Sequence, residues 1–192
     1  MFEYERQKFT EQKSSIRRLW NIEDKTAELL QFLVKIKSPR KVLEIGTSNG
    51  FSAFCLSVAA YPTEIHTIES DEKRYEMAKE NLKFRTNVIQ SFGLAETIIP
   101  ELDMKFDFVF IDAGKINYID YIKLLKGKLA TNALIVADNV LSHKETTKEY
   151  IEFLRVNPEF STMTLDIESG LEITLFNDKD VNVIYRNEVT EQ

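Results

Sequence analysis

The 192-residue sequence is poor in the residues that build covalent crosslinks and soft-metal sites. Its single cysteine, Cys55, excludes an internal disulfide and a cysteine-rich zinc site. The two histidines, His66 and His143, are too few for a histidine-rich metal site. Any bound metal would therefore be held mainly by oxygen atoms, which favours magnesium or calcium over zinc.

Long apolar runs and basic clusters are also lacking. The longest apolar stretch, residues 51–61, includes two serines and is far shorter than a membrane span of about 20 residues. The first six residues contain no apolar signal core. A net charge of −6 and a pI near 5.1 argue against a broad nucleic-acid surface. We therefore expect a cytoplasmic protein without a membrane or nucleic-acid partner.

What the sequence does contain is an alternation of short apolar strands and helices over residues 38–177. Residues 1–37 are expected to form a helical segment packed on this domain, and residues 178–192 a tail. The predicted strands are 41–45, 64–68, 88–90, 106–111, 133–137 and an antiparallel pair at 160–166 and 171–176. The predicted helices are 50–60, 71–84, 94–99, 117–128 and 144–156. This pattern predicts an α/β fold with a mostly parallel sheet covered on both faces.

Ligands of such sheets bind at the carboxyl ends of the strands, so the residues that follow each strand carry the functional argument. Gly46 and Gly50 follow the first strand with G-x-x-x-G spacing, which differs from the G-x-G-x-x-G pattern of dinucleotide-binding dehydrogenases. The glycines permit a sharp turn and a helix start that suits an anion, although a ligand-free turn would look the same. Glu69, after the second strand, could accept hydrogen bonds from ribose hydroxyls or cap the next helix.

Oxygen-bearing side chains follow two further strands. Asp112 comes directly after one, and Asp138 and Asn139 come after the next. If the strands are neighbours, these side chains converge as a site for a hard cation, and otherwise they serve as turn and cap residues. Lys115 is a candidate proton acceptor beside such a cation, whereas its position alone suits a solvated surface lysine.

These motifs together resemble those of the metal-dependent O-methyltransferases related to catechol and caffeoyl-coenzyme-A O-methyltransferase. The resemblance is carried by residues 42–46 with 50–52, 110–118, 137–140, 93–100 and 169–174. It implies a Rossmann-like, doubly wound, seven-stranded sheet with one antiparallel strand, which is the class I methyltransferase fold. It also allows a homodimer.

The resemblance further implies a role for each site residue. The divalent cation would be magnesium, with calcium or manganese as alternatives, and S-adenosylmethionine would be the methyl donor. Lys115 would act as general base, and the metal ligands would be Asp112, Asp138 and Asn139. The cofactor contacts would be Glu44, Gly46, Ser52, Glu69, Ala95 and Asp112.

The expected reaction is methyl transfer to a hydroxyl of a small, catechol-like or vicinal-diol acceptor. The segment between Asn139 and the next predicted helix is shorter than in many relatives, which leaves the acceptor itself open. Three alternatives remain on the sequence: a tRNA hydroxyuridine O-methyltransferase, a nicotinamide-dependent dehydrogenase and a non-catalytic protein that binds S-adenosylmethionine.

Overall fold

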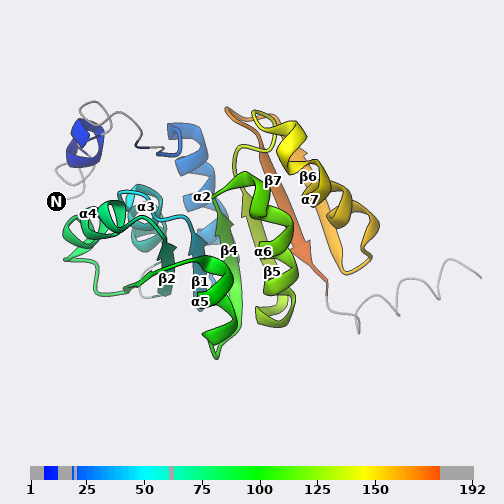
Figure 1. The fold of residues 1–192 in the computed structure, drawn as a ribbon, viewed down its shortest axis with the longest axis horizontal. Coiled ribbons are helices and arrows are strands. Elements are labelled where there is room, and N and C mark those ends of the chain that lie inside the picture. The colour runs from blue at the N-terminus through cyan, green and yellow to red at the C-terminus, as the bar shows by residue number, and fades with distance from the viewer. Residues whose placement is uncertain (1–6, 13–18, 20, 61–62, 178–192) are drawn as a thin grey trace, which may run out of the picture.

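The computed structural model describes residues 7–12, 19, 21–60 and 63–177. They form a seven-stranded sheet with the order β3-β2-β1-β4-β5-β7-β6 (Figure 1). The strands are β1 (Lys41–Ile45), β2 (Glu64–Glu69), β3 (Val88–Phe92), β4 (Phe106–Ile111), β5 (Leu129–Ala137), β6 (Phe160–Leu165) and β7 (Leu171–Phe176). β7 is antiparallel to both of its neighbours, and the other pairs are parallel. The predicted mostly parallel sheet with one antiparallel strand is therefore confirmed.

Helices cover both faces of the sheet, with α5, α6 and α7 on the face turned to the viewer in Figure 1. The helices are α2 (Asp24–Lys37), α3 (Phe51–Ala59), α4 (Glu72–Leu82), α5 (Ala95–Glu101), α6 (Tyr118–Leu125) and α7 (Lys144–Val156). Successive strand residues face opposite layers: Phe108 packs with α2, α3 and α4, whereas Val109 packs with α6 and α7. Continuous apolar strands are thus explained by burial on both sides.

Local signals account for where several helices begin and end. The carboxylate of Asp71 accepts the N–H of Arg74 at 2.9 Å and caps α4. At the end of α2, Ser38 takes a left-handed conformation with φ 48°, and Pro39 prevents the helix from continuing. α7 begins at Lys144, directly after the short segment that follows Asn139.

Some predicted boundaries were wrong. Residues 7–12 are helical, but Leu19 and residues 21–23 are not, so the first 37 residues are not one continuous helix. The rest of the N-terminal segment, at 1–6, 13–18 and 20, and the predicted tail at 178–192 lie outside the described residues. α5 includes Pro100, because a proline in the last turn removes only one hydrogen bond. β5 begins at Leu129, four residues before the predicted start. Phe106 pairs with Leu129 and Phe108 with Leu134, so a register shift places the extra polar residues of β5 between these two pairs.

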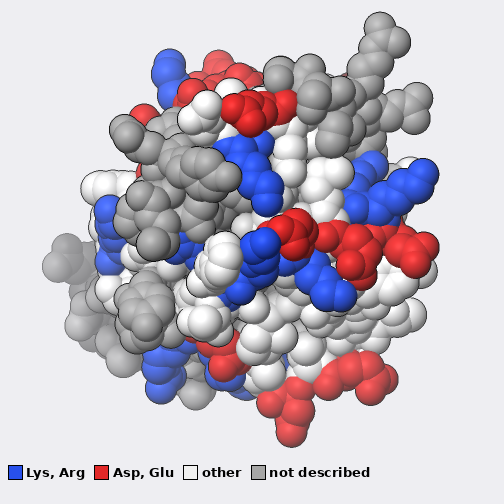
Figure 2. Space-filling view, turned by 90° about the vertical axis from the view of Figure 1, so that its left-hand side faces the viewer, with Lys and Arg blue, Asp and Glu red and all other residues white. Residues whose placement is uncertain are grey.

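The surface on the left of Figure 1 carries charges of both signs. α4 lies on this side, where Lys79 pairs with Glu76 at 3.4 Å and Lys83 pairs with Glu80. Figure 2 shows lysine and arginine side chains interspersed with aspartate and glutamate on this face. The described charged residues of this face are therefore mixed in sign. Among the described residues, no helix is both long enough and apolar enough to cross a membrane.

Candidate active site

A cavity of about 840 Å³ lies at the carboxyl ends of β1, β2, β4 and β5. The strand order reverses between β1 and β4, which is where doubly wound sheets bind ligands. Both ends of the cavity carry residues that the sequence predicts as functional. The predicted site residues that line it are Gly46, Glu69, Ala95, Asp112, Lys115, Asp138 and Asn139.

Strand register brings these residues to one edge. Ile45 pairs with Ile111, and Ile111 pairs with Ala137. The N–H of Asp112 donates to the carbonyl oxygen of Ile45 at 2.9 Å, and the N–H of Asp138 donates to that of Ile111 at 3.0 Å. The two aspartates therefore leave neighbouring strands at the same level, as the strand-end rule predicts.

The glycine loop, residues 46–50, needs its two glycines. Gly46 has a φ of +99°, and a Cβ there would lie 2.3 Å from the carbonyl oxygen of Asp112. Gly50 has a φ of +91°, and its Cβ would lie 2.8 Å from the side chain of Leu82. A side chain at either position would therefore combine backbone strain with a clash. The loop is held against the acid-bearing end of β4 as a result.

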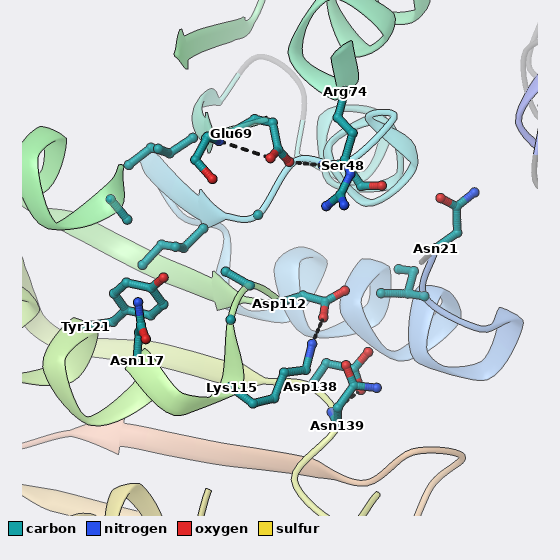
Figure 3. Close-up of a pocket in the computed structure, with 18 of the residues that line it drawn as sticks. Asn21, Ser48, Glu69, Arg74, Asp112, Lys115, Asn117, Tyr121, Asp138 and Asn139 are labelled. Atoms are coloured by element: carbon teal, nitrogen blue, oxygen red, sulfur yellow. Dashed lines mark hydrogen bonds and ion pairs between the residues drawn. The ribbon is translucent and has the colours of Figure 1, made fainter. Parts of the chain in front are cut away.

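Glu69 is buried at the end of β2 and holds the glycine loop. Its carboxylate accepts the backbone N–H groups of Ser48 at 2.7 Å, Ser70 at 3.0 Å and Asp71 at 2.9 Å (Figure 3). A carboxylate offers about four acceptor positions, so capacity remains for a ligand hydroxyl. The cap of α4, which the sequence left open for Glu69, is supplied by Asp71.

The other end of the cavity gathers an ion pair and two further oxygen-bearing side chains. Lys115 Nζ donates to Asp112 Oδ1 at 2.8 Å, and both side chains are largely buried. Figure 3 shows Asp138 and Asn139 directly below this pair. The side chains that the sequence predicts as metal ligands and base are therefore brought together at one place.

The ionised form of Asp138 is disfavoured in this arrangement. Burial, together with the charge of Asp112, raises its pKa to about 7, although the N–H of Asn139 donates to its Oδ1 at 2.6 Å. Two nearby carboxylates and an amide form an oxygen donor set that fits a hard divalent cation, which would offset this repulsion. Within the described parts of the chain, no group of three or more His, Cys, Asp and Glu side chains could hold a metal ion, so the set depends on the amide of Asn139.

The hydroxyl of Tyr118 connects the carboxyl ends of the two acid-bearing strands, β4 and β5. It is fully buried, and its hydroxyl lies 3.1 Å from the carbonyl oxygens of both Ile111 and Asp138. One hydroxyl hydrogen shared by two carbonyls fixes the ends of β4 and β5 relative to each other. The spacing between Asp112 and Asp138 is therefore set by packing as well as by the sheet.

Two predicted cofactor contacts do not line the cavity. Glu44 is fully buried behind the glycine loop, and Ser52 lies in the first turn of α3. Burial raises the pKa of Glu44 to about 8, and the charges of Asp112 and Glu69 add to this effect. The carboxyl of Glu44 accepts a hydrogen bond from the hydroxyl of Thr67. A direct contact of Glu44 or Ser52 with a cofactor stays a prediction.

The sequence of the chain is similar to those of known proteins. The O-methyltransferase family matches residues 3–157 of the chain. The chain belongs to this family. Caffeoyl-CoA O-methyltransferase 2 of Petunia hybrida is 31% identical over 141 residues, which are 64% of this chain and 56% of that protein. Catechol O-methyltransferase of Mycobacterium tuberculosis is 39% identical over 114 residues, 53% of this chain and 49% of that protein. The chain therefore spans about half the length of these relatives.

Solved structures show the same fold. The cofactor-bound structure of Rv0187 from MTB has a TM-score of 0.80 and 26% identity, over 87% of this chain and 86% of that chain. The O-methyltransferase TomG of Streptomyces achromogenes, in complex with SAM, has a TM-score of 0.79 at 24% identity, over 87% and 86% of the two chains. This O-methyltransferase family member therefore shares its architecture with proteins in which the cofactor has been seen.

Sequence reasoning missed several residues of the cavity. Arg74 and Asn21 both line it, and Figure 3 shows the guanidinium group of Arg74 directed toward its interior. Arg74 comes five residues after Glu69, in the first turn of α4, and this proximity to a strand end was the available signal. Asn21 precedes α2 in a stretch predicted to be helical, where a residue lining a cavity was not expected.

An amide network behind the glycine loop was also missed. The Gln12 Oε1 atom accepts the side-chain amides of Asn49 at 3.1 Å and Asn81 at 2.8 Å. Asn81 in turn donates to the carbonyl oxygen of Asn49 at 2.8 Å. Phe9, three residues before Gln12, packs on the ring of Phe51 at 5.5 Å. Residues 7–12 thus hold the glycine loop from the side away from the cavity.

The turn between β6 and β7 holds the loop after Asn139. The N–H of Val140 donates to the carbonyl oxygen of Gly170 at 3.0 Å. From the same turn, the Glu168 carboxylate accepts the N–H groups of Lys25 at 3.0 Å and Thr26 at 2.8 Å. One turn thereby caps the start of α2 and supports the acid-bearing loop.

Proposed function

We propose that this chain is an S-adenosylmethionine-dependent O-methyltransferase that methylates a hydroxyl of a small catechol-like or vicinal-diol acceptor in the presence of a divalent cation. The observation that carries the proposal is the joint placement of Asp112, Lys115, Asp138 and Asn139 at one end of a cavity whose other end holds Glu69. Membership of the O-methyltransferase family supports the same reaction.

The donor would occupy the end of the cavity formed by β1 and β2. S-adenosylmethionine would supply an electrophilic methyl group. Gly46 would let the ligand approach the backbone, Glu69 would accept a ribose hydroxyl, and Ala95, at the start of α5, would contact the adenine. The buried side chains of Ile45 and Ile68 line this end of the cavity and give it an apolar wall.

Asp112, Asp138 and Asn139 would hold the cation, with magnesium as the first choice and calcium or manganese as alternatives. A divalent cation there would lower the pKa of an acceptor hydroxyl and fix its position. The raised pKa of Asp138 supports this assignment. It indicates that Lys115 alone does not neutralise the two buried carboxylates, whereas a divalent cation would.

Lys115 would act as the general base. Its Nζ lies 2.8 Å from Asp112, at the side of the cavity where the acceptor hydroxyl would be held. Asp112 orients the amine through this hydrogen bond. A divalent cation and a sulfonium group beside it would favour the neutral amine, and removal of the hydroxyl proton by this neutral amine would leave an oxyanion facing the methyl group. Holding the reacting oxygen and methyl at about 3 Å in line would supply much of the rate gain.

The acceptor class rests on the relatives, whose names refer to catechol and to caffeoyl-CoA. Both names denote compounds with adjacent ring hydroxyls, which suit joint binding by a cation. Between Asn139 and α7 the described chain has only the short segment from Val140 to His143, so this segment adds no long loop over the acceptor end.

A methylation assay tests the proposal. The chain is incubated with S-adenosylmethionine, magnesium and catechol, and the methylated product is measured by mass spectrometry. We expect turnover that is lost on chelation with EDTA and restored by magnesium. Lys115→Ala is expected to lower kcat by about 10²- to 10⁴-fold, with donor affinity nearly unchanged.

Lys123→Ala is the matched control, because it removes the same charge from an exposed position on α6. It should leave kcat unchanged. Turnover that survives chelation contradicts the cation, and unchanged turnover in Lys115→Ala removes this residue from the mechanism. Absence of methyl transfer to any vicinal diol would shift the acceptor toward a tRNA hydroxyuridine.

A further inference from the structure

The cavity contains a cationic side chain far from the acid-bearing end. Among the described residues that line the cavity, Arg74 and Lys115 are the lysine and arginine side chains. Lys115 is held by Asp112 at one end, whereas Arg74 is partly buried in the first turn of α4. Figure 3 shows the guanidinium group of Arg74 extending from α4 toward Ser48, into the cavity. The proposed chemistry gives this arginine no role.

Ser48 contributes a second feature at the same place. It has a left-handed φ of 51°, and its N–H is fixed by the Glu69 carboxylate at 2.7 Å. Its Oγ atom is buried and has no hydrogen-bond partner among the described residues. A buried hydroxyl without a partner costs free energy, so a ligand atom that bonds to it would be stabilised.

The start of α3 adds positive potential to this end of the cavity. α3 follows Gly50, which has no side chain to cap the helix. The first hydrogen bond of the helix joins the N–H of Phe54 to the carbonyl oxygen of Gly50 at 2.9 Å. The N–H groups of the preceding turn have no acceptor within the helix and carry a partial positive charge.

We propose that Arg74, together with Ser48, binds the amino-acid carboxylate of the methyl donor. This inference rests on the proposed function, because it takes S-adenosylmethionine as the ligand. If the ribose lies at Glu69 and the methyl group faces Lys115, the amino-acid part of the donor would extend over the glycine loop. A carboxylate placed between Glu69 and Asp112 would be repelled unless a cation faced it.

The planar guanidinium of arginine suits this task better than a lysine amine would. It presents donors in a fixed fork that matches the two oxygens of a carboxylate. Arg74 is positioned by its own helix, because its N–H is bound by the Asp71 carboxylate at 2.9 Å. Arg74 is thus a specificity-determining residue for a donor that retains its carboxylate.

The test compares two ligands that differ in one group. Dissociation constants are measured by calorimetry for S-adenosylmethionine and for decarboxylated S-adenosylmethionine, with the unaltered chain, Arg74→Gln and Arg74→Lys. We expect Arg74→Gln to weaken S-adenosylmethionine roughly 10- to 100-fold and the decarboxylated ligand by no more than about twofold. Arg74→Lys should lie between, because it keeps the charge and loses the fork.

Lys73→Gln is the control, since it removes the same charge from the preceding, exposed position of α4. It should leave both dissociation constants unchanged. Undiminished binding of S-adenosylmethionine by Arg74→Gln, or an equal loss for the two ligands, overturns the inference. If the unaltered chain binds neither ligand, the proposed function is overturned along with it.

Discussion

Gly46 is the residue at which the glycine loop comes closest to the acid-bearing end of β4. Its φ of +99° and the 2.3 Å approach of the Asp112 carbonyl oxygen leave no room for a side chain. Gly127, just after the end of α6, has open space around a Cβ position and no positive φ. These two glycines therefore allow the geometric requirement to be separated from the general effect of adding a methyl group.

We expect Gly46→Ala to lower the free energy of unfolding by at least about 2 kcal/mol and to weaken donor binding, because either the loop or the Asp112 segment must move. Gly127→Ala should change stability by no more than about 0.5 kcal/mol. Urea denaturation and calorimetry measure both effects. Equal stabilities of the two variants would show that the close approach is relieved without cost.

Residues at strand ends could be predicted from the sequence, whereas residues that reach the cavity from helices could not. Asp112 and Asp138 directly follow apolar strands, and a parallel sheet fixes where such positions lie. The direction of Arg74 depends on how α4 packs on β2 and β3, which no local pattern encodes. Gln12 reaches Asn49 across 37 positions of sequence, and an amide in an N-terminal helix is ordinarily solvated.

At the scale of elements, the turn between β6 and β7 connects parts that are distant in sequence. Glu168 supplies the cap that α2 lacks, because Glu23 at its N-cap position makes no side-chain cap bond. The hydroxyl of Thr26 also donates to this carboxylate, at 2.7 Å. The start of α2 is therefore held by a residue more than 140 positions later.

Glu168→Ala is expected to lower the free energy of unfolding by about 1–2 kcal/mol, which is typical of a lost helix cap. Glu28→Ala serves as the comparison, since Glu28 is exposed on the same helix, and it should change stability by less than about 0.5 kcal/mol. Chemical denaturation of both variants measures the difference. Equal effects would mean that the cap contributes nothing specific.

Elements with local signals were predictable to within a few residues. α7 was predicted at the residues where it forms, and α4, predicted over 71–84, forms over Glu72–Leu82 with Asp71 as its N-cap. The break before α2 was not predictable, because the cap that begins this helix comes from Glu168. The early start of β5 depends on an irregular pairing with β4, which alternation of apolar residues does not reveal.

For the molecule as a whole, buried carboxyls couple stability to pH. The Glu44 carboxyl ionises near 4.5 in the unfolded chain and near pH 8 in the folded chain, because burial raises its pKa. Unfolding therefore releases a proton between these values, and the free energy of unfolding falls as pH rises through that window. Asp138, raised from 3.8 to about 7, acts in the same direction.

We expect Glu44→Gln to remove part of this dependence. Its stability relative to the unaltered chain should increase from pH 5 to pH 8, by on the order of 3 kcal/mol, in the absence of ligands. Glu101→Gln, at an exposed position at the end of α5, should follow the unaltered chain at every pH. Thermal unfolding across this pH range measures the three profiles, and parallel profiles for Glu44→Gln would exclude a buried, neutral Glu44.

The sheet order also bears on how the chain is made. β1, β2, β3 and β4 can pair with one another once residues 41–111 have been synthesised. β5 lies between β4 and β7, so its second neighbour arrives only with residues 171–176. Until then, the strand that carries Asp138 and Asn139 at its end is an open edge. Nascent chains that stop before residue 171 would therefore expose this edge to chaperones and to one another.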